Sequence, residues 1–100
     1  WVHPNPKSSQ AAASAADWKN AKDFNLVITN ASGPEAWPIA ATNFILMYKQ
    51  PKDAKRSADT IAFFKWAFEN GQVQAQALDY VPLPAELVQQ VEAYWAAEFK

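Results

Sequence analysis

The stretch WPIAATNFILMYK, residues 37–49, decides how the rest of the chain is interpreted. Its five consecutive apolar residues, 44–48, follow a proline and several small residues and precede Lys49. A continuous apolar run of this length is typical of a strand covered on both faces of a parallel sheet. We therefore expect an α/β fold with one central strand over residues 38–49. A chain of 100 residues has little material of its own with which to cover such a strand.

About four helices are expected to accompany this strand. Asn5 before Pro6 is a favourable N-cap followed by a favourable first helical residue, and Gly71 is a typical residue just after a helix end. A short strand over residues 24–29 and a turn over 30–35 are also expected. The helices are predicted at residues 6–16, 53–70, 72–79 and 84–99.

The predicted helix 53–70 is apolar on most sides, whereas a surface helix usually shows an apolar stripe a little over about 100° wide. It carries four aromatic side chains, Phe63, Phe64, Trp66 and Phe68. Burying them, at roughly 1.5–3 kcal/mol each, requires a large partner surface. Either the chain pairs with copies of itself, or it is a piece of something larger.

Composition excludes several classes of function. The 9 basic and 10 acidic residues give a net charge of −1, which provides no field for nucleic acid or an anionic membrane. The absence of Cys removes disulfides and thiolate chemistry. No apolar run approaches the roughly 18 residues that span a bilayer. The chain opens on Trp1 rather than Met, so we expect a processed, truncated or incomplete product.

Motifs that carry chemistry are missing from this pattern. The one histidine, His3, lies near the chain end, and the scattered carboxylates form no metal-ligand spacing, so no catalytic residue, metal or cofactor is predicted. Neither Gly33 nor Gly71 lies in a phosphate-binding loop pattern. The one arginine, Arg56, falls in a polar segment with three lysines, which is interpreted as a solvated surface: Lys49, Lys52 and Lys55.

Three segments resemble, in order and spacing, a known family. They are EAWPIAATNFILMYKQP (35–51), IAFFKWAFENGQVQAQALDYVPLP (61–84) and LVQQVEAYW (87–95), and ADW at 16–18 adds to them. Together they resemble the C-terminal third of the periplasmic phosphate-binding proteins of bacterial phosphate ABC transporters. The resemblance covers essentially the whole chain.

The resemblance implies a two-lobe periplasmic binding protein, of type II-like architecture, that closes on inorganic phosphate by a hinge motion and delivers it to the membrane permease subunits. It implies a periplasmic or lipid-anchored cell-surface location. The family binds phosphate through residues of its first two thirds, so no phosphate ligand is assigned to this chain, Arg56 included. The partners expected are inorganic phosphate, the remainder of the same protein and the permease.

The resemblance also assigns a hinge. Trp37, Pro38 and Ile39 correspond to one crossover between lobes. Residues 1–37 then form the tail of one lobe leading to this crossover, and residues 38–100 supply a strand and helices of the other lobe. The role of this chain would be structural.

Two other functions stay open on the sequence. The chain is compatible with a self-standing α/β interaction module that covers its strand by homo-oligomerisation or strand addition. An enzyme is the third alternative, and the single histidine and scattered carboxylates disfavour it. We therefore expect a chain that is not an enzyme.

Overall fold

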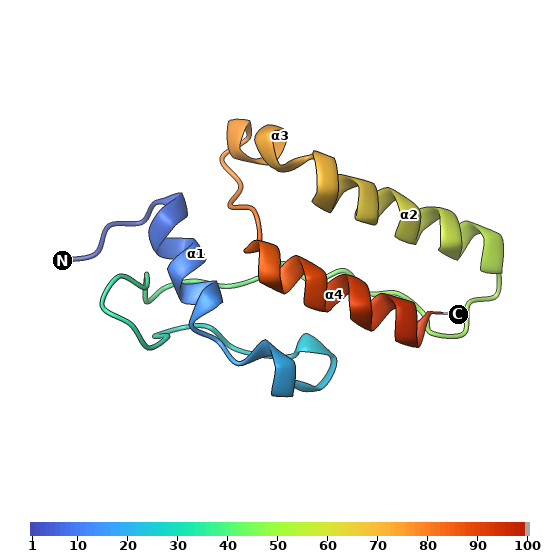
Figure 1. The fold of residues 1–100 in the computed structure, drawn as a ribbon, viewed down its shortest axis with the longest axis horizontal. Coiled ribbons are helices and arrows are strands. Elements are labelled where there is room, and N and C mark those ends of the chain that lie inside the picture. Colours follow the sequence, from blue (N-terminus) through green and yellow to red (C-terminus); the bar gives the residue numbers. More distant parts are fainter. Residues whose placement is uncertain (100) are drawn as a thin grey trace.

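The computed structural model describes residues 1–99. They form four α-helices and two short 3-10 helices, arranged as a thin layer with extents of 49 × 30 × 18 Å (Figure 1). Because one helix with its side chains is about 10–12 Å across, an 18 Å layer has little room to enclose an element on all sides. The elements are α1 (Pro6–Ser14), η1 (Trp18–Asn20), η2 (Lys22–Phe24), α2 (Ala54–Asn70), α3 (Gln72–Ala77) and α4 (Ala85–Glu98).

The predicted helices are confirmed, and local caps determine where they begin and end. Asn5 Oδ1 accepts a hydrogen bond from the Ser8 amide at 2.9 Å, and Ser8 Oγ accepts one from the Asn5 amide at 3.1 Å, which makes a capping box for α1. At the start of α2, Asp53 Oδ1 accepts a hydrogen bond from the Arg56 amide at 3.0 Å. Gly71 directly follows the last residue of α2.

The predicted central strand over residues 38–49 is wrong, and so is the α/β fold class that depended on it. Residues 1–99 contain no strand, and residues 39–52 make no backbone–backbone hydrogen bond within this described part. A β-strand requires a neighbouring segment that pairs with it, and here none does. The shorter strand predicted over 24–29 is wrong for the same reason, since η2 is followed by irregular backbone. The described chain is therefore helical.

The buried core is small and lies where α4 meets the N-terminal segments. Trp18, Ile28 and Leu87 form it, and Val91 and Phe24 pack against it as partly buried neighbours. No large side chain among the described residues is completely buried. Residues from both sides of the predicted hinge thus share one core.

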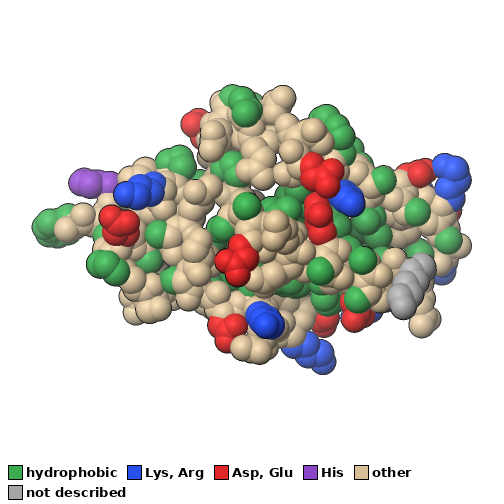
Figure 2. All heavy atoms as spheres, viewed as in Figure 1, with side chains coloured by type: hydrophobic (Ala, Val, Ile, Leu, Met, Phe, Trp, Pro, Cys, Tyr) green, Lys and Arg blue, Asp and Glu red, His purple; other side chains and the backbone are tan. Residues whose placement is uncertain are grey.

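Much of the apolar surface lies outside this core. α2 has no buried residue, and its stacked pair Phe63 and Trp66 is 59% and 58% exposed. Leu46 and Tyr48 are 92% and 83% exposed. Figure 2 shows hydrophobic side chains gathered between α2 and α4. This agrees with the expectation that the chain cannot by itself cover the stretch 37–49.

Candidate functional site

The predicted hinge residues lie where backbone hydrogen bonding stops. The Trp37 amide donates to the Ser8 carbonyl at 3.0 Å, and the Pro38 carbonyl accepts from the Asn30 amide at 2.7 Å. From Ile39 onward, no such bond is made up to residue 52 in the described chain. Backbone hydrogen bonds thus join Trp37 and Pro38 to the N-terminal segments, while residues 39–52 of the described chain make none.

The candidate catalytic and anion-binding residues do not come together in the structure. His3 is exposed, and its contribution is a backbone carbonyl that accepts a hydrogen bond from Ser8 Oγ at 2.6 Å. Lys55 Nζ pairs with Asp59 Oδ2 at 2.6 Å on the surface of α2. Lys49 instead pairs with Glu98 on α4, at 2.8 Å between Nζ and Oε2. These lysines pair with surface carboxylates, so they fit the expected solvated surface and not an anion-binding site.

A polar network that the sequence analysis missed surrounds Lys49. Asp23 Oδ1 accepts a hydrogen bond from Tyr94 Oη at 2.5 Å and lies 3.5 Å from Lys49 Nζ. Lys49 Nζ also lies 5.7 Å from the centroid of the Tyr94 ring, and Phe24 meets that ring edge-on. The network joins η2, residue 49 and the last turns of α4. Asp23 and Tyr94 are 71 positions apart, so no local pattern signals their contact.

The contacts in this network shift three pKa values. The hydrogen bond from Tyr94 lowers the pKa of Asp23 below its ordinary 3.8, and the Lys49 charge acts in the same direction. The same hydrogen bond raises the pKa of Tyr94 above 10.0. The hydrogen bond to Glu98 raises the pKa of Lys49. By linkage, the stability that Asp23 adds to the folded state is present above about pH 4, and it is lost as pH falls through the lowered pKa of Asp23. The stability that Tyr94 and Lys49 add is lost as pH rises through the raised pKa values of these two groups.

Removing the Asp23 charge is expected to lower the pKa of Tyr94 toward the ordinary value of 10.0. The variant Asp23→Asn tests this in a tyrosinate absorbance titration, with Tyr94→Phe identifying which of the three tyrosine signals belongs to Tyr94. An unchanged Tyr94 titration in Asp23→Asn would show that the contact is absent in solution.

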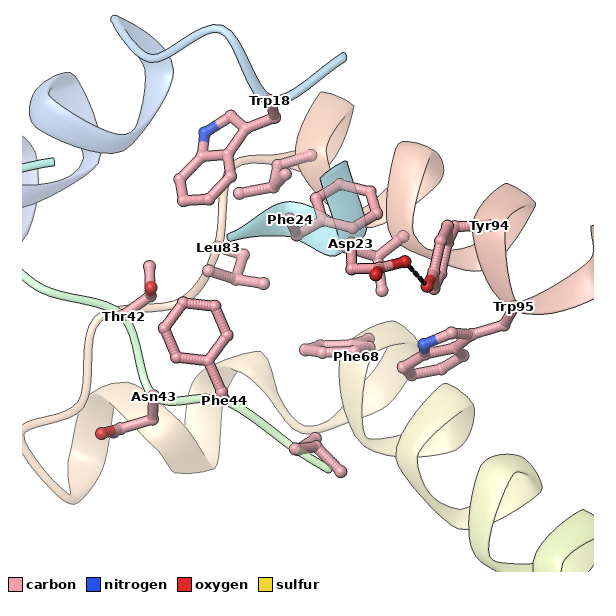
Figure 3. A pocket seen from close by; sticks show the side chains of 13 residues that line it. Trp18, Asp23, Phe24, Thr42, Asn43, Phe44, Phe68, Leu83, Tyr94 and Trp95 are labelled. Atoms are coloured by element: carbon pink, nitrogen blue, oxygen red, sulfur yellow. Dashed lines mark hydrogen bonds between the residues drawn. The ribbon is translucent and has the colours of Figure 1, made fainter. Parts of the chain in front are cut away.

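An apolar cavity of about 140 Å³ lies beside this network, between α2, α4 and residues 42–45 (Figure 3). Phe68 of α2 and Trp95 of α4 stack against each other in its wall, at 5.6 Å between ring centroids. Phe44 and Leu83 point into it from the irregular segments. One polar group in its wall is isolated: Thr42 Oγ1 is shielded from solvent and has no hydrogen-bond partner among the described residues.

The described residues contain no group of three or more His, Cys, Asp or Glu side chains placed to hold a metal ion. None of the four described α-helices is long and apolar enough to cross a bilayer. What the site presents is an open aromatic cavity and a set of exposed apolar side chains, and such patches are typical of surfaces that bind protein, membrane or ligand. Fold and site together define a helical segment with a large uncovered apolar surface.

Comparison with known proteins shows which proteins the chain is similar to. No protein-family model matches the chain. Over all 100 residues it is 69% identical to the phosphate-binding protein PstS of Xylella fastidiosa strain 9a5c, of which it covers 28%. It is 40% identical to the proteins of the same name from Pasteurella multocida and Haemophilus influenzae, of which it covers 29% and 30%. The chain spans less than a third of these relatives and matches their C-terminal part. The resemblance found in the sequence is confirmed.

Proposed function

We propose that this chain is a segment of a periplasmic phosphate-binding protein that captures inorganic phosphate and delivers it to the permease subunits of an ABC transporter. The observation that carries this proposal is the 69% identity over the whole chain to a protein named for phosphate binding. The relatives at 69% and 40% identity carry names of binding proteins, in agreement with the expectation that the chain is not an enzyme. The proposed location is the periplasm, or the cell surface where such a protein is lipid-anchored.

Within that protein, the proposed role of this segment is structural. Residues 1–37 would belong to one lobe and residues 38–100 to the other, with Trp37, Pro38 and Ile39 as one hinge crossover. The change in backbone hydrogen bonding after Pro38 supports this position for a hinge. The core that Trp18 and Ile28 share with Leu87 crosses the proposed division, so under this proposal it is a contact between the two lobes. The ring of Pro38 also fixes its own φ, which limits how the crossover bends.

The phosphate ligands are proposed to lie outside these residues. A buried anion needs several converging donors. Arg56, the one arginine, is exposed at the start of α2, and the lysines paired on the described surface point to neighbouring carboxylates. The observed cations therefore do not converge on a common point.

Phosphate calorimetry tests the proposal with two proteins. One is the 100-residue chain, and the other is a chimaera that joins the part of the Xylella relative preceding the match to this chain. We expect saturable phosphate binding by the chimaera and none by the chain alone. Tight binding by the chain alone would contradict the placement of the ligands, and a folded chimaera without phosphate affinity would contradict the function.

A further inference from the structure

We propose that the cavity between α2, α4 and residues 42–45 is a socket that the rest of the same polypeptide fills with an apolar side chain. This inference rests on the proposed function, because it takes its occupant from the part of the protein outside these 100 residues. It adds where that part docks and what chemistry it presents.

The walls of the socket select an apolar occupant. Phe44, Phe68, Val91 and Trp95 present hydrocarbon and ring surface to the cavity. The charged group at its rim, Asp23, already accepts a hydrogen bond from Tyr94 and lies near Lys49. It therefore offers no unpaired charge to attract a charged side chain. A volume of about 140 Å³ has space for one large aliphatic or aromatic group.

Thr42 adds a polar requirement to this occupant. Its hydroxyl oxygen is shielded from water and has no partner in the described chain. A buried hydroxyl without a hydrogen bond costs about 1–3 kcal/mol, so native proteins rarely leave one unpaired. The docking segment is therefore inferred to bring a backbone or side-chain hydrogen-bonding group to Thr42, next to its apolar side chain, and the residues that now shield this oxygen must move to admit that group.

The socket is continuous with the other uncovered apolar surface. Phe44 and Ile45 line it, and the exposed Leu46 and Tyr48 follow directly in the sequence. α2, which forms one wall, has no buried residue. A single docking surface thus extends from the socket along residues 44–48.

The rest of the polypeptide is favoured over a second copy of the chain. The chain covers 28% of the Xylella relative, so more than two thirds of such a protein lies outside it and is covalently attached. Attachment gives that part a high effective concentration at the surface, which a free second copy lacks.

Overpacking the socket tests the proposal in the chimaera. Val91→Phe adds a ring to the cavity wall, so a filled socket must rearrange and the unfolding equilibrium constant is expected to rise roughly fivefold to a hundredfold. Val73→Phe on α3, where Val73 is 75% exposed, is the matched control and should change that constant less than about twofold. Denaturant unfolding without phosphate measures both.

Thr42→Val provides the second test, because it removes the hydroxyl at nearly constant volume. If the docked segment hydrogen-bonds Thr42, the unfolding constant should rise about fivefold or more. An unchanged or lower constant in Thr42→Val, or a Val91→Phe variant no less stable than Val73→Phe, would overturn the proposal.

Two further measurements on the chimaera separate the remaining outcomes. Sedimentation shows whether it is a dimer that Val91→Phe dissociates, which would make a second copy the occupant and overturn the proposal. Phosphate calorimetry on the unsubstituted chimaera tests the proposed function independently. If a folded chimaera shows the Val91→Phe effect but binds no phosphate, the proposed phosphate-binding function is refuted and the proposed occupant of the socket is still supported.

Discussion

Replacing Trp18 by alanine is expected to lower the free energy of unfolding of the chimaera by about 3–5 kcal/mol. Trp18 is 6% exposed and packs against Ile28 and Leu87 in the small core. Its removal leaves a cavity between the N-terminal segments and α4, lined by neighbours that include Phe24 and Leu83. Denaturant unfolding followed by circular dichroism measures the loss.

Trp18→Phe is the graded control for this substitution. It keeps an aromatic ring but loses the hydrogen bond that Trp18 Nε1 donates to the Ala13 carbonyl at 2.7 Å. That carbonyl still accepts a bond from the Ala16 amide at 3.3 Å, so it is not left unpaired. We expect a cost of about 1–2 kcal/mol. A loss below about 1 kcal/mol in Trp18→Ala would show that this cluster is not a core of the intact protein.

The helices could be predicted because their signals are local. Asn5 caps α1 through a residue three positions away, and Asp53 caps α2 in the same way. Gly71 ends α2 within the same few residues. Caps of this kind depend on neighbours in sequence, which a single sequence displays completely.

Residues 38–49 could not be predicted in the same way, because a strand depends on a second segment. Their apolar run indicates burial, but burial and strand pairing both depend on residues far away in sequence. In this chain the segment stays unpaired and its apolar side chains, such as Leu46, stay exposed. The apolar run thus indicated correctly that cover is missing and wrongly that a strand forms, because cover and strand pairing both require residues outside this segment.

The candidate site shows the same division. The assignment of Trp37, Pro38 and Ile39 to a hinge came from the resemblance, not from periodicity, and it stays a prediction. Neither the resemblance nor the periodicity predicted the contact between Asp23 and Tyr94, because it depends on how η2 packs against α4. Asp23 and Phe24 take positive φ values of 52° and 57°. Asp adopts such values more often than most residues but Phe rarely does, so sequence propensity did not indicate this turn.

In the chimaera, the backbone amides of residues 39–52 are expected to exchange with deuterium at least about a hundredfold more slowly than amides of an unstructured peptide. Within the described chain these residues make no backbone–backbone hydrogen bond, so the chain alone provides no such protection. Protection must then come from groups of the preceding polypeptide that cover the docking surface. A factor of a hundred corresponds to about 2.7 kcal/mol of local opening free energy, which is modest for a buried segment. Exchange read by mass spectrometry on short peptides measures it.

Residues 30–35 are the internal control for this measurement. Among them Ala31, Ser32 and Gly33 also donate no backbone hydrogen bond in the described chain, but they form a turn that carries no large apolar side chain. They have no reason to be covered, and should exchange near the unprotected rate. If residues 39–52 exchanged as fast as this turn in a folded chimaera, their apolar side chains would face water in the intact protein. Leaving Leu46 and Tyr48 exposed would forgo roughly 1.5–3 kcal/mol for each of them, and the docking surface would then have no occupant.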